Sequence, residues 1–249
     1  GRVIETPLSE TMLTGACVGM AMEGFVPIYV HARFDFALFC WEHLINTAAK
    51  LAALGRACPI ILRVVVGRGG GQGPTHSQSF HGMLAQVSGL EVFVPATPKQ
   101  YLEVFQHALQ SLCPTIIVEP RRLYEQGLEQ WMEWLPNYDV QLCPVGDTLL
   151  DAVESQAELM HLGVKANVVP IIRCSQQAND YAREHRLVPT VIIDMGHGGF
   201  GMMKAHQYER VTVVCSPFCP APARPDLEAA FYPTASDIVG AALNLLGRQ

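Results

Sequence analysis

Charged residues are scarce in this chain, and basic residues are the scarcer kind. Only 16% of the 249 residues are Asp, Glu, Lys or Arg, compared with about 25% in an average globular protein. Lysine and arginine number 17 against 23 aspartates and glutamates, so the net charge is −6. A general nucleic-acid binder needs a basic face that displaces counterions from phosphates, and this charge balance excludes that class.

Long apolar runs are also missing. Runs such as 60–62 and 115–118 have the length of strands, whereas a membrane helix needs about 18 consecutive apolar residues. We therefore expect no membrane segment, and no secretory signal is recognisable at the start of the chain. The first residue is Gly1 rather than Met, which predicts a processed or trimmed product.

The eight cysteines lack the usual metal and redox spacings, since no C-x-x-C occurs. Scattered cysteines in a chain of this length predict reduced, buried thiols in a cytoplasmic protein or in one of an organelle matrix. Cys215 and Cys219 leave open a shared metal or a disulfide, although their spacing fits no standard zinc pattern.

Hydrophobic residues, in contrast, make up 49% of the chain, and its mean hydropathy is +0.19. A chain this apolar excludes disorder and predicts extensive burial, part of it against another chain.

Strands and helices alternate in two stretches of the chain. In the first, helices are predicted over 9–23, 36–54, 77–87 and 98–111, and strands over 27–32, 59–66, 91–95 and 115–119. In the second, strands are predicted over 139–143, 166–172, 189–194 and 210–215, and helices over 147–162, 175–186 and 236–247. The expected helix caps are Ser9, Thr97 before Pro98, and Ser236 with Asp237.

Such alternation predicts parallel sheets covered by helices on both faces. We therefore expect an α/β protein of two three-layer, doubly wound domains with mainly parallel sheets. The domains are predicted at 1–121 and 139–249, joined by a linker at 122–138 that carries a short helix.

A glycine-rich segment at 67–73 follows a predicted strand. It matches neither dinucleotide- nor nucleotide-binding patterns, so a flexible rim of an active site is favoured over a phosphate cradle. His76 follows in a polar run, where it is placed either for proton transfer or simply as a capping or solvent-facing residue.

Glu10 opens a helix that is otherwise nearly uncharged, where a carboxylate is favoured by the helix dipole alone. Gly15 and Gly19, four residues apart, predict a close helix contact at a domain or subunit boundary. Four aromatic residues open the next predicted helix, and packing in the core is favoured for most of them: Phe34, Phe36, Phe39 and Trp41. A Cys40–His43 catalytic pair is conceivable from the spacing, but its position inside an apolar helix disfavours it.

Several motifs taken together resemble one known family. They are RVIETPLSE at 2–10, the small-residue helix at 15–24, FDF at 34–36, NTAAK at 46–50, the run from Arg63 through GGGQGPTHSQS to Ser79, EPRRLY at 119–124 and GGFG at 198–201. In this order the chain resembles, from end to end, the β subunit of the thiamine-diphosphate-dependent 2-oxo-acid dehydrogenases, of the pyruvate, branched-chain and acetoin types.

The resemblance implies a transketolase-like pyrimidine-binding domain followed by a transketolase C-terminal domain. It implies that Glu10 hydrogen-bonds a ring nitrogen of the cofactor pyrimidine, that Phe36 stacks on that ring, and that Leu8 lines the same pocket. His76 matches a histidine that serves substrate or acceptor in proton transfer. Weak matches of Ala108 and Cys113 imply a monovalent cation that some relatives bind.

In this family the diphosphate and Mg²⁺ bind a G-D-G motif on the α subunit. Gly146-Asp147-Thr148 is not that motif. The resemblance therefore implies a half-site that is inactive alone, and an α₂β₂ heterotetramer, with a lipoyl acyltransferase as a further partner.

The chain also departs from the family pattern. Only five residues precede Thr6, where relatives carry a longer stretch, which predicts a shortened, divided or split form. Four positions differ from the residues that many relatives have there: Val30, His31, Phe39 and His81. The segments 125–137 and 172–186 also differ from the family pattern. Two alternatives thus stay open: the β half of a split transketolase-like or acyloin-forming enzyme that transfers a two-carbon ketol or acyl unit, and a non-catalytic regulatory subunit.

Overall fold

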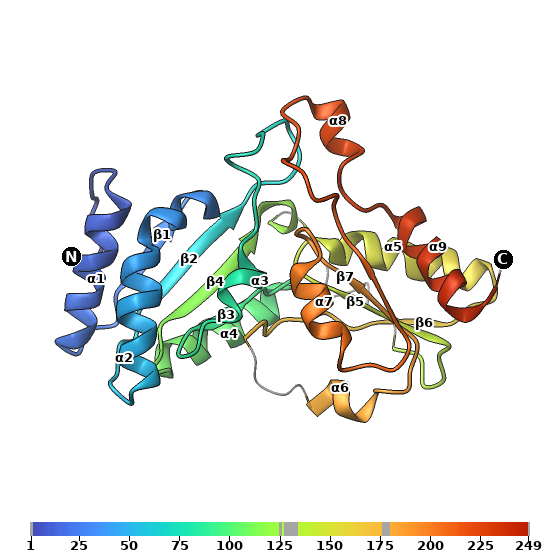
Figure 1. Cartoon of the computed structure of the whole chain (residues 1–249), viewed down its shortest axis with the longest axis horizontal. Helices are drawn as coiled ribbons and strands as arrows, with labels where there is room; N and C mark the ends of the chain where they lie inside the picture. The colour runs from blue at the N-terminus through green and yellow to red at the C-terminus, as the bar shows by residue number, and fades with distance from the viewer. Residues whose placement is uncertain (1, 125, 127–133, 176–179, 249) are drawn as a thin grey trace.

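The computed structural model describes residues 2–124, 126, 134–175 and 180–248. Its strands form two four-stranded sheets, and every strand pair in both sheets is parallel. Figure 1 shows the two sheets side by side, with the N-terminus at one end of the molecule and the C-terminus at the other. The predicted α/β class with mainly parallel sheets is confirmed.

The first sheet has helical segments on both faces. Its strands are β1 (Ile28–His31), β2 (Ile61–Val66), β3 (Glu91–Phe93) and β4 (Thr115–Pro120), in the order β1-β2-β4-β3. Successive side chains of a strand point to opposite faces, so β2 packs Leu62 on the segment 34–49 and Ile61 on helix α4 (Pro98–Gln110). These faces give the three layers that the sequence predicted.

The second sheet packs outward on two long helices and inward on the first half. It joins β5 (Val140–Pro144), β6 (Ala166–Val168), β7 (Thr190–Ile193) and β8 (Val211–Val214) in the order β6-β5-β7-β8. Its outer face lies on α5 (Thr148–His161) and α9 (Ala235–Leu246). Its inner face, with Cys143 and Ile192, shares one core cluster with Val92 of β3 and Phe200 of α7 (Gly199–Ala205).

A short segment of the second half closes the edge of the first sheet. The amide of Val94 donates to the carbonyl of Ile172, and that of Cys174 donates to the carbonyl of Val92, both at 2.8 Å. The strand predicted over 166–172 is therefore too long: β6 ends at Val168, and the chain then crosses to β3, where it satisfies backbone groups at a strand edge. The domain boundaries stay a prediction, because 125 and 127–133 of the linker lie outside the described residues.

The single α-helix predicted over 36–54 is wrong in form. A 3₁₀ helix (Phe34–Cys40), a π-helix (Glu42–Ala49) and α2 (Lys50–Ala53) follow one another. Phe34, Ala37 and Cys40 are all fully buried, and their spacing of three suits the three residues per turn of a 3₁₀ helix. This winding leaves Phe36 half-buried beside them.

The remaining helices differ from prediction in extent. Helix α1 (Glu10–Met22) and α4, α5 and α9 occupy their predicted positions, whereas α3 (His81–Leu84) is shorter. Of the helix predicted over 175–186, α6 (Asp180–Glu184) is observed and 176–179 lie outside the described residues. Of the linker, a 3₁₀ turn (Arg121–Leu123) is described. Helices α7 and α8 (Pro225–Ala229) were not predicted, because glycine and proline disfavour helix locally.

The caps agree only in part with the sequence. Thr97 Oγ1 accepts from the amide of Gln100 at 3.2 Å, with Pro98 opening α4 as predicted. Helix α9 is capped by Thr234 in a capping box with Asp237, rather than by Ser236. Ser9 precedes α1, but its side chain makes no capping hydrogen bond.

Candidate functional site

The structure brings Glu10 and Phe36 together through one buried thiol. Cys40 Sγ donates to the carbonyl oxygen of Glu10 at 3.3 Å and lies 4.0 Å from that of Phe36. Thr14 Oγ1 donates to the same sulfur at 3.0 Å. The start of α1 is thereby held against the 3₁₀ helix, and two residues that lie far apart in the sequence become neighbours.

The same thiol is not a nucleophile in this setting. Burial raises the pKa of Cys40, so it stays protonated near neutral pH. Its closest ring nitrogen is His31 Nε2 at 3.9 Å, and His43 packs instead against α1, where a Cβ at Gly15 would lie 3.1 Å from its ring. The Cys40–His43 hypothesis gains no support. The close approach expected at Gly15 is confirmed, whereas nothing lies near Gly19.

The Glu10 carboxylate is half-buried and, among the described residues, makes no hydrogen bond or ion pair. The charge of Glu10 acts on a neighbouring residue, because it adds to the effect of burial in raising the pKa of Tyr29. A carboxylate at a helix start interacts favourably with the helix dipole. The Glu10 carboxylate is therefore available to a hydrogen-bond donor on a bound molecule.

Phe36 and His76 also meet. Their rings lie edge to face with centroids 5.7 Å apart. The loop that carries His76 is held to the 3₁₀ helix because Gln78 Nε2 donates to Asp35 Oδ1 at 2.8 Å. Burial raises the pKa of Asp35, and the hydrogen bond from Gln78 opposes that rise. Glu10 and Phe36 are thus linked through Cys40 by their backbone carbonyls, and Phe36 and His76 are linked by their rings.

Three other predicted residues are placed differently. Leu8 is 96% exposed in the single chain. Ala108 is buried in α4, and the carbonyl of Cys113 accepts from the hydroxyls of Ser111 and Thr115, both at 3.4 Å. The roles of Leu8 at the cofactor pocket and of Ala108 and Cys113 at a monovalent cation stay predictions.

His31 is a buried histidine that the sequence noted only as a departure from the family. It is 2% exposed, its Nδ1 has no hydrogen-bond partner among the described residues, and its ring lies 4.5 Å from that of Tyr29. Burial lowers the pKa of His31 to about 4, although the charge of Glu10 opposes this. The imidazole is therefore neutral behind Glu10 at physiological pH.

We expect His31 to make the chain sensitive to mild acid. The unfolded chain takes up a proton on this histidine near pH 6.5, whereas the folded one does so only near pH 4, so stability is lost as pH falls through this window. Between pH 7.5 and pH 5 the linkage amounts to about 2 kcal/mol. Urea unfolding at both pH values checks this, with His31→Gln as the comparison. An equal loss of stability in both proteins would contradict it.

The glycine-rich loop does not act as a free phosphate cradle. Glu228 of α8 accepts from the amides of Gly69 at 3.0 Å and Gly71 at 2.6 Å. Figure 1 shows this loop and α8 together at the top of the molecule. The loop amides that an anion would need are thus bound to a carboxylate from the second half.

Gly71 makes a testable contribution to this contact. It has a φ of +68°, and a Cβ there would lie 2.4 Å from the carbonyl oxygen of Ala223. Gly71→Ala is expected to lower the free energy of unfolding by about 1–3 kcal/mol, because it combines backbone strain with a clash. Gly69, also at positive φ but with nothing nearby, is the matched control, and its alanine variant carries the strain alone. Equal losses in urea unfolding would show that the Ala223 contact is unimportant.

A buried contact between a histidine and an aspartate joins the two halves. His81 Nε2 lies 3.2 Å from Asp194 Oδ1, and the two side chains are 2% and 1% exposed. Ser79 Oγ lies 2.8 Å from His81 Nδ1, and the amides of Gly196 and Gly201 donate to Asp194. Burial raises the pKa of Asp194. The charge and hydrogen bond of His81, together with the two amides, lower that pKa by more, so it lies below its ordinary value.

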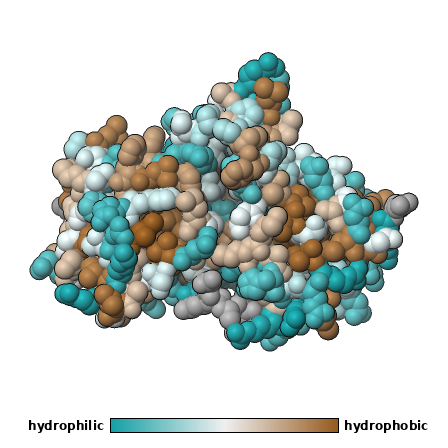
Figure 2. All heavy atoms as spheres, viewed as in Figure 1, coloured by the Kyte–Doolittle hydropathy of each residue, from teal (hydrophilic) through white to brown (hydrophobic). Residues whose placement is uncertain are grey.

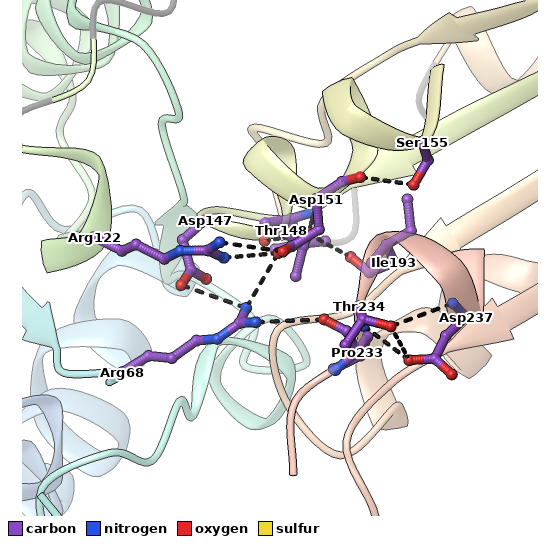
Figure 3. Close-up of polar contacts among 11 residues, drawn as sticks. Arg68, Arg122, Asp147, Thr148, Asp151, Ser155, Ile193, Pro233, Thr234 and Asp237 are labelled. Carbon is purple, nitrogen blue, oxygen red and sulfur yellow. Dashed lines mark hydrogen bonds and ion pairs between the residues drawn. The ribbon is translucent and has the colours of Figure 1, made fainter. Parts of the chain in front are cut away.

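A second charged group joins the first half to α5. Figure 3 shows Arg68 and Arg122 pointing toward Asp147 and Asp151 at the start of that helix. Arg122 binds Asp151 through both nitrogens at 2.7 and 3.2 Å, and Arg68 lies 3.5 Å from Asp151 and 3.6 Å from Asp147. Burial raises the pKa of Asp147, and the charge of Arg68 opposes the rise.

Sequence reasoning missed several of these residues. Asp194, Arg68 and Arg122 each lie within two residues of the end of a buried strand in a chain with few charges, and that position was the available signal. The carboxyl ends of parallel strands gather at one edge of a sheet, where ligands bind. Glu228 gave no such signal, since it lies in a helix that was not predicted.

The fold and this group of residues define a pyrimidine-binding α/β domain of the transketolase type. The chain belongs to the family described as the transketolase pyrimidine binding domain, whose family model matches residues 1–126.

Individual relatives show which members of this family the chain resembles. The β subunit of the acetoin:2,6-dichlorophenolindophenol oxidoreductase of Cupriavidus necator is 28% identical, over 97% of this chain and 79% of its own. The pyruvate dehydrogenase E1 component β subunit of Rhizobium meliloti is 29% identical, over 66% of this chain and 35% of its own. The predicted resemblance to β subunits of 2-oxo-acid dehydrogenases is confirmed.

Solved structures agree with the fold. A structure described as a split gene transketolase, inactive β4 tetramer, superposes with a TM-score of 0.76 at 18% identity, over 96% of this chain and 82% of its own. A transketolase of Campylobacter jejuni superposes with a TM-score of 0.75 over 97% of this chain and 39% of its own.

Two further findings concern the whole chain. All eight cysteines are free thiols: four are buried, three, including Cys17 and Cys215, are partly buried, and Cys219 is exposed. No helix in the described part of the chain is both long enough and apolar enough to span a bilayer.

Proposed function

We propose that this chain is the β component of a two-component thiamine-diphosphate enzyme. In this proposal the enzyme oxidatively decarboxylates a 2-oxo acid and passes the acyl group to a lipoyl carrier. The observation that carries it is that Cys40 contacts the backbone carbonyls of both Glu10 and Phe36, with the ring of His76 against that of Phe36. The Glu10 carboxylate has no partner among the described residues. The dehydrogenase and oxidoreductase β subunits among the relatives support the same reading.

These residues fit the pyrimidine half of the cofactor. Glu10 offers a carboxyl oxygen with no competing donor among the described residues, and Phe36 offers a half-buried aromatic face. When bound, thiamine diphosphate supplies a nucleophilic carbon and an electron sink for decarboxylation. Glu10 would hold a proton shared with a ring nitrogen of the pyrimidine, and Phe36 would orient the ring and exclude water from that side.

His76 has the geometry of a proton carrier. Its Nδ1 lies 3.0 Å from Thr75 Oγ1, which leaves Nε2 free to exchange a proton with a substrate. The contact with Phe36 would keep the His76 ring beside a pyrimidine stacked on Phe36. His76 would therefore bind or move a proton on the substrate or the acceptor, as the family resemblance implies.

The diphosphate and Mg²⁺ would be held by an α subunit, since the chain has no G-D-G motif. Exposed apolar side chains support such a partner: Ile28 and Val30 on the edge strand β1 are each 47% exposed, and Phe39 is 63% exposed. Figure 2 shows hydrophobic residues gathered on the surface of the N-terminal half. An α₂β₂ heterotetramer would bury this surface, and a lipoyl acyltransferase would then take the acyl group.

The test is turnover of the chain reconstituted with its α-type subunit, thiamine diphosphate and Mg²⁺. A panel of 2-oxo acids and ketose phosphates is supplied with an artificial electron acceptor. Oxidation of one 2-oxo acid supports the proposal. Carbon–carbon transfer from a ketose without 2-oxo-acid oxidation moves the chain to the split transketolase-like alternative, and no dependence on this chain favours a regulatory subunit.

A further inference from the structure

A cavity of about 560 Å³ lies between the two halves of the chain, apart from the candidate site. The first half contributes the loop after His76 and helix α3, and the second contributes α7 and two segments, 216–221 and 231–232. Glu10, Phe36 and His76 are not among its described lining residues. Proteins enclose small molecules in cavities of about 300–1,000 Å³, so this one has the size of a second ligand site.

Helices α3 and α7 pack closely at one wall of this cavity. A Cβ at Gly82 of α3 would lie 2.9 Å from the Cβ of Phe200, so a larger residue there would push the two helices apart. The rings of His81 and Phe200 lie edge to face with centroids 5.1 Å apart. Figure 1 shows the two helices side by side near the middle of the molecule. The wall is therefore formed by close packing before any ligand binds.

The lining is mainly apolar and presents no free charge. Its larger apolar side chains are Phe80, Met83, Phe200, Ala221 and Phe231. In the described part of the chain, Asp194 is the one acidic residue of the lining, and no lysine or arginine joins it. The Asp194 carboxylate lies 3.2 Å from His81 Nε2 and accepts from two backbone amides. A charged ligand would thus lose water without gaining a counter-charge, which favours an uncharged one.

Three buried hydroxyls also line the cavity. Ser216, Ser77 and Tyr232 are 3%, 7% and 7% exposed. None of their hydroxyl oxygens makes a hydrogen bond of ordinary geometry within the described part of the chain. A buried hydroxyl without a partner costs free energy, and most such groups in proteins are therefore paired. A molecule with a polar oxygen, bound in the cavity, would supply the missing partner.

Tyr232 is held in position to donate such a hydrogen bond. The guanidinium of Arg68 lies 4.3 Å from the centroid of its ring, and the ring packs edge to face on Phe231. Burial raises the pKa of Tyr232 to about 12, with the charge of Glu228 adding to the rise and that of Arg68 opposing it. The nearby Ser77 hydroxyl also opposes the rise. The phenol is therefore protonated at physiological pH and can donate to an oxygen.

We propose that this cavity binds an uncharged, mainly apolar small molecule that carries a hydroxyl or carbonyl oxygen. Its apolar body would lie against the aromatic side chains of the lining, and its oxygen would pair with the hydroxyls of Ser216 and Tyr232. Ser77 directly follows His76, so a bound molecule would contact the loop that carries this histidine. The inference rests on the side chains of the cavity and is independent of the proposed function.

Cys219 offers a local measure of whether the cavity is occupied. It lines the cavity and is the one exposed thiol of the eight, so iodoacetamide reaches it readily. The probe is 2-naphthol, which is uncharged at neutral pH and carries one hydroxyl on an apolar body. In the full chain, 2-naphthol is expected to slow the alkylation of Cys219, followed by mass spectrometry, and to leave that of Cys113, outside the cavity, unchanged. Naphthalene-2-sulfonate, with the same rings and a charge, should need a roughly 10-fold higher concentration for equal protection.

Ser216→Ala and Tyr232→Phe each remove one hydroxyl and keep the remaining shape of the wall. Each is expected to raise the 2-naphthol concentration for half protection by roughly 3- to 10-fold, the usual net contribution of one hydrogen bond. Because the Ser216 hydroxyl lacks a partner, its removal should leave the midpoint of urea unfolding unchanged or higher. Ser236→Ala, which changes an exposed serine of α9 outside the cavity, is the matched control.

Three results would overturn this inference. The first is no protection of Cys219 by 2-naphthol, or equal protection by the sulfonate. The second is unchanged half protection in both hydroxyl variants. The third is a lower urea midpoint in Ser216→Ala, which would show that the folded chain already pairs this hydroxyl. None of these measurements requires the cofactor, an α subunit or turnover, so their failure is distinguishable from failure of the proposed function.

Discussion

Glu10→Gln is expected to lower the kcat of the reconstituted enzyme by roughly 10²–10⁴-fold, the usual contribution of a positioned acid–base group. Glutamine preserves the shape of the side chain but cannot hold a proton shared with the cofactor. The structure makes this a clean test, because the carboxylate makes no hydrogen bond or ion pair with any described residue. The thermal midpoint should therefore stay within the range of an ordinary surface substitution.

Glu23→Gln is the matched control for this prediction. Glu23 is exposed at the C-terminal end of the same helix, thirteen residues after Glu10. Turnover should be unaffected in this variant, and both proteins should assemble with the α-type subunit to the same extent. Full activity in Glu10→Gln would refute the assignment of the site, and equal losses in both variants would point to helix α1 as a structural contact only.

Asp194→Asn is expected to destabilise the folded chain by about 3–5 kcal/mol, since it leaves the buried His81 without its charged partner. The pair is held by contacts from both sides: Gly196 and Gly201 donate to the Asp194 carboxylate at 2.8 and 2.9 Å, and Ser79 Oγ lies 2.8 Å from His81 Nδ1. An asparagine amide can keep one of the backbone bonds but supplies no charge. Chemical unfolding at neutral pH measures the loss.

A double-mutant cycle isolates the pair from its surroundings. His81→Gln and the double variant complete the cycle with Asp194→Asn. If the two residues are coupled as the 3.2 Å distance implies, the double variant is more stable than the sum of the single losses predicts. Strict additivity would show that the ion pair contributes nothing and that each side chain acts alone.

The same pair has a defined dependence on pH. The pKa of Asp194 lies below its ordinary value in the folded chain, so the unfolded chain binds the proton first as pH falls. The stability from this carboxylate is therefore present above about pH 4 and is lost as pH falls further, below the window in which His31 titrates. Stability measured between pH 5 and pH 3 should fall more steeply in the wild type than in Asp194→Asn.

Local patterns were sufficient for the parts of the fold that depend on neighbouring residues. The alternation of apolar strands with amphipathic helices determined two parallel α/β units, because parallel strands require a crossover between them. The cap at Thr97 followed from side chains within four residues of the helix start. The spacing of three residues between Phe34, Ala37 and Cys40 is also typical of a 3₁₀ helix, although the surrounding apolar run was interpreted as an α-helix.

The candidate site was accessible from the sequence only in part. Glu10, Phe36 and His76 were found because each lies in a motif that resembles a family, and not because any one of them is unusual alone. The structure adds that Cys40 holds the start of α1 against the 3₁₀ helix of Phe36, and that Gln78 holds the loop of His76 to the same helix.

The sequence by itself determined the class of the protein: the parallel α/β architecture, its family and the three residues on which the proposed chemistry depends. Only the tertiary structure decided what those residues lie against. Glu228 binds the glycine loop from 157 and 159 positions away, Asp194 meets His81 across the two halves, and Arg33 gathers with Arg121 at one sheet edge. Such contacts have no local period or spacing, because they form only when the long crossovers have closed and the strand ends lie side by side.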